Sequence, residues 1–89
     1  MKAVITVIGR DSVGIIAKMS ALCAEKKVNI LDITQKVLDD MFVMIMITEI
    51  SGLEIKFTEF VDLMNQAGHE IGLEVHTMHE DIFNAMHEI

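Results

Sequence analysis

The chain has 89 residues, a single cysteine and a formal net charge of −7. This length fits one domain, and the negative charge excludes direct binding to nucleic acid or to anionic membrane surfaces, because both are bound by clustered Lys and Arg. The lone Cys23 cannot form an intramolecular disulfide and is typical of the reducing cytoplasm. We expect a cytoplasmic protein of one domain, residues 1–89, that does not span a membrane.

Apolar residues make up 52% of the chain, which is more than a small monomer needs. A domain of this size buries only about 60–65% of the surface of its unfolded chain. We therefore assign the apolar surplus to a subunit interface and expect a homo-oligomer, in the simplest case a homodimer.

The first third of the chain predicts a strand followed by a helix. Residues 2–8 are rich in Val and Ile and predict a strand that ends at Gly9. A helix is predicted from about residue 13 to 27, with Asp11 or Ser12 as its cap. The apolar residues that recur at helical spacing and predict its buried face are Ile15, Ile16, Met19, Leu22 and Cys23.

Residues 28–38 and 41–49 predict two further strands, joined by a turn at Asp39-Asp40. The strand over 41–49 is apolar on both faces until Thr48. Alternation in the other strand places Ile30, Asp32, Thr34 and Lys36 on one face and Leu31, Ile33, Gln35 and Val37 on the opposite face.

The last part of the chain predicts a helix, a strand and a short helix. Ser51 and Glu54 have the spacing of a capping box, and Gly68 is placed to end the helix that follows. Residues 71–78 predict a strand, and residues 80–88 an amphipathic helix. The buried face of the longer helix is predicted at Phe57, Phe60, Val61, Met64 and Ala67.

This order predicts an α+β fold, a ferredoxin-like βαββαβ sandwich over residues 2–78, with a short helical tail over 79–89. The first and third strands are the most apolar and are expected at the centre of an antiparallel sheet. Right-handed crossovers send both longer helices to the same face. The opposite face is then bare until the tail helix or a partner subunit covers it, and its expected apolar residues are Val4, Ile8, Met44 and Met46.

The loop from Gly9 to Gly14 is the strongest candidate site. Its two glycines allow close backbone approach, and the helix that begins there presents amide N–H groups toward anions such as a carboxylate. Asp11 provides a partner for an ammonium group. These groups together match a free amino acid, although the same spacing also fits an ordinary capped turn.

The loop Gly9-Arg10-Asp11-Ser12-Val13-Gly14-Ile15 resembles the G-x-D-x-x-G-[ILV] signature of ACT domains, and Asn29-Ile30-Leu31-Asp32-Ile33 resembles the opening of their second strand. The resemblance follows the element order through residues 2–78. Residues 81–89 resemble the ending of a group of uncharacterised single-domain bacterial and archaeal ACT proteins, which is similar to the glycine-cleavage repressors.

The resemblance implies a non-enzymatic regulatory domain, without cofactor or metal, that binds an amino acid or another small ligand between two subunits. The first loop of one subunit and the second strand of its neighbour would form the site. Many ACT domains have proline where this chain has Val13, and its absence leaves the loop less preorganised. The implied ligand-binding residues are Gly9, Arg10, Asp11, Ser12, Val13, Gly14, Asn29, Ile30 and Asp32.

Three alternatives remain open at this point. A pure oligomerisation domain would explain the apolar surplus without a ligand. An acylphosphatase-like hydrolase would use Arg10 for phosphate and Asn29 for water, but Asp11 would repel the phosphate. A metal site at His76, His79 and Glu80 has suitable ligand types but not the spacing of a known motif.

Overall fold

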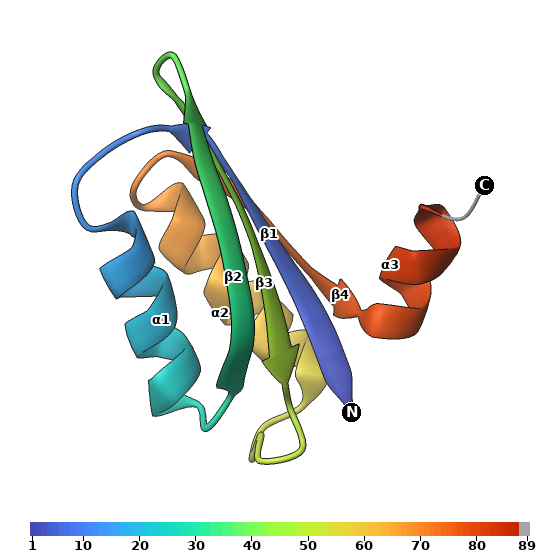
Figure 1. Ribbon diagram of the computed structural model, residues 1–89. Helices are drawn as coiled ribbons and strands as arrows, with labels where there is room; N and C mark the ends of the chain where they lie inside the picture. Colours follow the sequence, from blue (N-terminus) through green and yellow to red (C-terminus); the bar gives the residue numbers. More distant parts are fainter. Residues whose placement is uncertain (88–89) are drawn as a thin grey trace.

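The computed structural model describes residues 1–87 as a four-stranded antiparallel sheet with three helices (Figure 1). The fold is ferredoxin-like βαββαβ with a C-terminal helix, as the sequence predicts. Residues 88–89 of the predicted tail helix lie outside the described residues. In chain order, the elements are β1 (Lys2–Arg10), α1 (Ile15–Glu25), β2 (Asn29–Leu38), β3 (Met41–Glu49), α2 (Phe57–His69), β4 (Leu73–His79) and α3 (Glu80–Met86).

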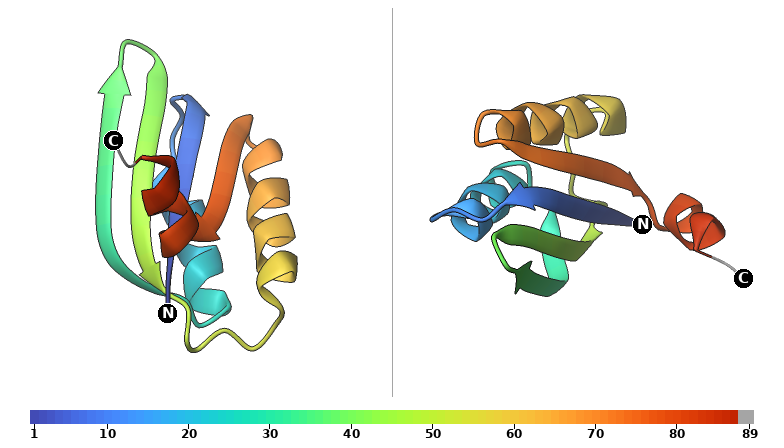
Figure 2. Two further views of the ribbon diagram at one scale, coloured as in Figure 1. Left: turned by 90° about the vertical axis from the view of Figure 1, so that its right-hand side faces the viewer. Right: turned by 90° about the horizontal axis from the view of Figure 1, so that it is seen from above.

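The sheet has the strand order β2-β3-β1-β4, so the two most apolar strands lie at its centre. Figure 2 shows α1 and α2 on one face of this sheet and α3 on the other. We call these the helix face and the open face. Asp39 starts the β2–β3 turn with a φ of 58°, a left-handed conformation that Asp tolerates better than most residues. Among residues 1–87 no helix is long and apolar enough to cross a membrane.

The core fills the space between the sheet and the two longer helices. Met19 and Cys23 of α1 and Phe60 and Met64 of α2 are buried against it, as the helical spacing predicts. Burial raises the pKa of the Cys23 thiol from 9.0 to about 11, because the thiolate is poorly solvated there. Cys23 is therefore a small core residue, as expected from its place in the helical pattern.

Two predicted residues of the open face belong to the core instead. Met44 and Met46 are fully buried on the helix face, whereas Val4 and Ile8 lie on the open face as predicted. The prediction for the two methionines is wrong because β3 is apolar on both sides, so its alternation carries no information about direction.

β2 contains an irregularity that the sequence pattern did not predict. Its register with β3 shifts between Ile30 and Asp32, which leaves Leu31 as the extra residue of a bulge. Ile30 therefore shares the helix face with Ile33, and Asp32 lies on the open face. The predicted face of Ile30 is wrong for this reason, because one inserted residue inverts the alternation that precedes it.

The capping box predicted for α2 does not form. The helix begins at Phe57 after Lys56, and no side chain within residues 1–87 caps it. Glu54 instead pairs with Lys27 Nζ at 2.8 Å. At the other end the helix passes through Gly68, where a Cβ would lie 2.3 Å from Val75 Cγ2, so the glycine permits close packing of α2 on β4 rather than ending the helix.

The end of β3 is fixed by a cluster of hydrogen bonds around Glu49. Glu49 Oε1 accepts hydrogen bonds from Ser51 Oγ at 2.6 Å, from the Ser51 backbone N–H at 2.9 Å and from the Met1 ammonium group at 2.9 Å. The hydrogen bond from the Ser51 hydroxyl is the largest of the causes that lower the pKa of the Glu49 carboxyl to about 2. Ser51 is thereby engaged with the preceding strand and does not cap α2.

The Cys23 thiol should resist alkylation in the folded protein. With a pKa of about 11 instead of 9.0, its thiolate fraction at pH 8 is about 100-fold smaller, and burial hinders access further. We expect iodoacetamide to label native protein at least 100-fold more slowly than protein unfolded in concentrated urea, measured by mass spectrometry. Equal rates in both conditions would contradict the buried position.

Glu49 should contribute to stability above pH 5 and less in acid. Its folded-state pKa of about 2 lies below the ordinary value of 4.5, so the contribution is complete above the ordinary pKa and is lost as the pH falls toward 2. We expect the thermal midpoint of Glu49→Gln to fall below that of the wild type at pH 7 and to converge with it near pH 2. Glu74→Gln, at an exposed position of β4, is the control and should show no such convergence.

Candidate functional site

The predicted loop connects the end of β1 to the start of α1. Gly14 is the N-cap residue of α1 with φ 91° and ψ 6°, and no side chain within residues 1–87 caps this helix. The prediction that Asp11 or Ser12 caps the helix is therefore wrong. The cap position is Gly14, which lies three residues after Asp11 and two residues after Ser12. The amide N–H groups of the first turn of α1 are left without a side-chain acceptor.

The two glycines of the loop are required for different reasons. A Cβ at Gly9 would lie 2.6 Å from Leu73 Cδ2 and 2.9 Å from the carbonyl oxygen of Gly72, so Gly9 permits close pairing of β1 with β4. A Cβ at Gly14 would meet no atom of the described chain within 4 Å, but its positive φ disfavours other residues. Gly9 is thus a packing residue and Gly14 a conformational one.

The side chains of the loop point into solvent. Asp11, Ser12 and Val13 are exposed, and the side chain of Val13 is as accessible as in an extended peptide. The backbone N–H of Asp11 donates to the carbonyl oxygen of Asp40 at 2.7 Å, and Arg10 Nη2 lies 3.5 Å from Asp40 Oδ2. The loop is therefore attached to the turn between β2 and β3, while its polar side chains remain accessible.

The predicted strand half of the site lies at the other end of the sheet. Arg10 pairs with Met41 at one end of β3, and Asn29 pairs with Glu49 at the other. Eight residue steps along β3 separate these pairs, about 27 Å at 3.4 Å per residue. One chain therefore brings Gly9, Arg10, Asp11, Ser12, Val13 and Gly14 together, but not with Asn29, Ile30 and Asp32.

Asn29 and Asp32 are exposed, whereas Ile30 is half-buried against the core. The sheet bulge thus separates the three residues by face, with Asp32 on the open face and Ile30 on the helix face. The same 27 Å separation, about eight residue steps, prevents Arg10 and Asn29 from forming an acylphosphatase-like site within one chain.

The histidines considered as metal ligands do not converge. His76 lies on the open face, and His79 lies on the helix face, where its ring stacks on Phe57 with a centroid distance of 4.2 Å. Within residues 1–87 no group of three His, Cys, Asp or Glu side chains is placed to hold a metal ion. Strand alternation separates His76 from His79 because they are three residues apart.

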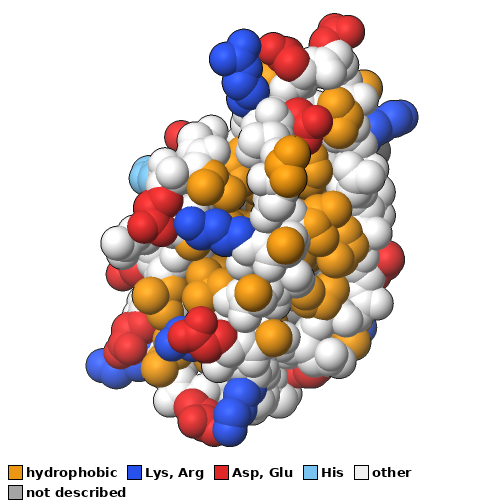
Figure 3. All heavy atoms as spheres, turned by 90° about the vertical axis from the view of Figure 1, so that its left-hand side faces the viewer, with side chains coloured by type: hydrophobic (Ala, Val, Ile, Leu, Met, Phe, Trp, Pro, Cys, Tyr) orange, Lys and Arg blue, Asp and Glu red, His pale blue; other side chains and the backbone are white. Residues whose placement is uncertain are grey.

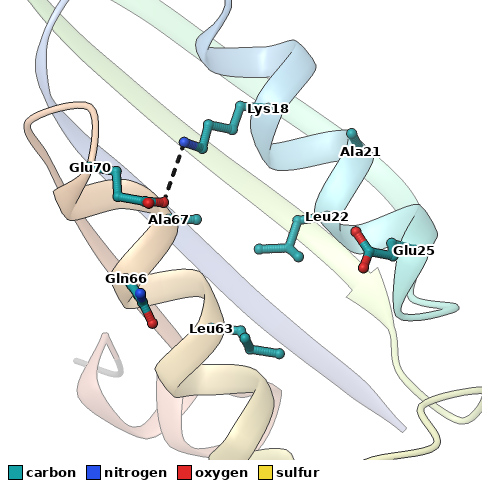
Figure 4. A pocket seen from close by; sticks show the side chains of 8 residues that line it. All are labelled: Lys18, Ala21, Leu22, Glu25, Leu63, Gln66, Ala67 and Glu70. Carbon is teal, nitrogen blue, oxygen red and sulfur yellow. Dashed lines mark hydrogen bonds and ion pairs between the residues drawn. The ribbon is translucent and has the colours of Figure 1, made fainter.

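A hollow that the sequence did not predict lies between α1 and α2 on the helix face. Figure 3 shows hydrophobic side chains gathered along this face, and Figure 4 shows the hollow from close by. Its volume is about 390 Å³, and Lys18 Nζ lies 3.5 Å from Glu70 Oε1 across one end. These two residues lie 52 positions apart, so no local pattern could have paired them. The lining residues are Lys18, Ala21, Leu22, Glu25, Leu63, Gln66, Ala67 and Glu70.

Replacement of Gly14 by alanine should destabilise the start of α1 through the backbone alone. A left-handed conformation costs an L-residue about 1–2 kcal/mol, and nothing within 4 Å of the added Cβ adds a steric clash. We expect urea unfolding to show a loss of about 1–2 kcal/mol for Gly14→Ala and a smaller loss for Gly14→Asn. Equal stability of Gly14→Ala and wild type would contradict the positive φ.

Comparison with known proteins places this arrangement in a family. A sequence model described as ACT domain matches residues 2–78. The UPF0237 protein of Methanocaldococcus jannaschii is 43% identical over 88 residues, which cover 99% of this chain and 98% of that protein. The UPF0237 protein of Clostridium acetobutylicum is 43% identical over 89 residues, the full length of both chains.

Solved structures agree with this assignment. An ACT domain protein from Streptococcus pneumoniae is 37% identical, has a TM-score of 0.82 and shares 97% of each chain. A protein assigned as a glycine cleavage system transcriptional repressor is 22% identical with a TM-score of 0.66, covering 85% of this chain and 43% of that one, which shows a shared fold. The chain therefore belongs to the ACT domain family, together with the UPF0237 proteins.

Proposed function

We propose that this ACT domain is a regulatory, non-enzymatic domain that binds an amino acid at the interface between two copies of the chain. The observation that carries the proposal is the position of the two predicted halves of the site at opposite ends of the sheet, about 27 Å apart. A site that uses both halves requires a second chain. The second chain could dock along the outer edge of the sheet, which β2 forms.

The outer edge of β2 offers a way to bring the halves together. No strand within residues 1–87 pairs with this edge, and the strand is 10 residues long. An exposed edge of this length is a template for another strand. Antiparallel pairing of β2 with its copy about a two-fold axis would bring Asn29 and Asp32 of one chain toward the Gly9–Gly14 loop of the other, and the symmetry would create two such sites.

The groups in such a combined site match an amino acid. The uncapped first turn of α1 provides N–H donors for a carboxylate, and the exposed Asp11 provides an acceptor for an ammonium group. Asn29 and Asp32 of the second chain add an amide and a carboxylate. A free phosphate or acyl phosphate fits less well, because two carboxylates would repel it.

Regulation follows from the place of the loop in the fold. Because the Asp11 N–H donates to Asp40 O, a ligand that orders the loop also orders the turn at the end of β2. A ligand that contacts both chains favours the paired state by its differential affinity for that state. We place the protein in the cytoplasm on the basis of its single, free and buried Cys23.

Ligand binding is tested with a thermal-shift screen of the free amino acids on the purified protein. We expect at least one amino acid to raise the midpoint, and Asp11→Ala to weaken its binding about tenfold or more through loss of a charge-assisted contact. Asp62→Ala, an exposed acidic position on α2, is the control and should bind normally. If no amino acid raises the midpoint, the domain is one for oligomerisation alone.

Mixing two variants tests whether the site is shared between chains. Asp11→Ala disables the loop half and Asp32→Ala the strand half, so either homodimer has two defective sites. In a mixed dimer both changes fall in one site and the other site is intact. We expect calorimetry of the mixed protein to recover up to half of the wild-type stoichiometry per mixed dimer. Absence of recovery, or unimpaired binding by Asp32→Ala alone, would contradict a site shared between two chains.

A further inference from the structure

The open face of the sheet is only partly covered by the chain itself. Figure 2 shows α3 in front of the sheet, and α3 packs against β1 and β4. A hollow of about 360 Å³ remains between α3 and these strands. The residues that line it are Thr6, Ile8, His76, Met78, Phe83, Met86 and His87.

The part of the open face formed by β3 is apolar from Met41 to Ile47. A strand of an antiparallel sheet with one face in water normally alternates apolar and polar residues. Over most of its length β3 does not alternate, because its open side carries Met41, Val43, Ile45 and Ile47 before Glu49 at its end. Met41 is 48% and Ile45 36% exposed. We call these four residues the β3 strip, and its composition is that of a covered surface.

α3 also has more apolar surface than its own sheet covers. Ile82, Phe83 and Met86 form a stripe about 100° wide on this helix of seven residues. Phe83 and Met86 line the hollow, but Met86 remains 66% and Ile82 54% exposed. The outer side of the stripe is therefore apolar surface that residues 1–87 leave exposed, which is typical of an interface.

We propose that the open face docks a second copy of this chain, with α3 of each copy lying over the β3 strip of the other. Each copy has both a half-covered helix and a half-covered strip, so the surface is self-complementary, as a two-fold interface requires. In this arrangement the α3 helices, each about 10–12 Å across, form a layer between the two sheets. This interface is separate from the β2 edge and does not depend on the proposed ligand site.

Charge complementarity supports a second copy as the occupant. Glu80 and Asp81 occupy the first turn of α3, and Lys36 lies on the open face of β2 opposite Val43. None of these three charged side chains forms an ion pair within residues 1–87. A two-fold axis that carries the first turn of α3 to the Lys36 end of the partner's sheet pairs opposite charges at both ends of the interface.

The oligomeric mass tests the interface. We expect the double variant Ile82→Glu/Met86→Glu to halve the mass measured by light scattering after gel filtration, because buried charge opposes docking. The mass falls from tetramer to dimer if the β2 edges also pair and from dimer to monomer if they do not. A failure of the edge-paired dimer is therefore distinguishable from a failure of this proposal.

The control is Asn84→Glu/Ala85→Glu, which adds two charges at exposed positions of the same helix outside its apolar stripe. This variant should keep the wild-type mass, and circular dichroism should show that both variants are folded. An unchanged mass for Ile82→Glu/Met86→Glu, or an equal fall for both variants, would overturn the proposal and would leave the open face to a different partner.

A charge exchange tests the assigned orientation. Lys36→Glu should raise the dissociation constant of this interface roughly threefold or more, and adding Asp81→Lys should restore it. In the matched control, Lys36→Glu is combined with Asp62→Lys on α2, and this second substitution should not restore the dissociation constant. Failure of Asp81→Lys to restore association would overturn the placement of α3 at the Lys36 end.

Discussion

Right-handed crossovers that carry α1 and α2 to the same face of the sheet are the constraint on which the rest of this structure depends. They put the whole core on one side, where Met19, Phe60 and Met64 close over the central strands. They also leave a second face that the two longer helices cannot cover. In a chain of 89 residues with 52% apolar composition, that second face must be partly apolar.

The same topology separates the two halves of the proposed site. β1 and β2 run in opposite directions to the β3 strand that lies between them, so the loop after β1 and the first residues of β2 fall at opposite ends of the sheet. The distance is a property of the fold rather than of any side chain. A ligand-binding function that uses Asp11 together with Asp32 is consequently an argument for assembly.

The fold was predictable because the chain is locally consistent. Strand order follows from the apolar composition of β1 and β3, and the buried faces of α1 and α2 follow from helical spacing, except at Ile16, which is 39% exposed. The predictions from the sequence fail where one pattern of residues is compatible with two structures. An apolar strand has no polar side to orient it, so the sequence does not indicate that Met44 and Met46 lie on the helix face.

Other features depend on contacts between distant residues, which a single sequence does not reveal. Ser51 could cap a helix or bond Glu49, and the structure has the second arrangement. The bulge at Leu31 is defined by the pairing of β2 with β3, so the sequence of β2 alone does not predict it. The bond from Asp11 to Asp40 joins a loop to a turn 29 positions later (40 minus 11), and it attaches the candidate site to the end of β2.

The hydrogen bond from Asp11 to Asp40 also connects the candidate site to the two strands that form the proposed interfaces. The Asp39-Asp40 turn connects β2, whose outer edge is unpaired within residues 1–87, to β3, which carries the apolar strip. In the proposed mechanism a change in the loop would reach these two strands first, because β4 lies on the far side of β1. The ligand loop is therefore attached to the hairpin whose outer strand, β2, would pair with a second chain, and we expect a ligand bound at the loop to influence pairing at that edge.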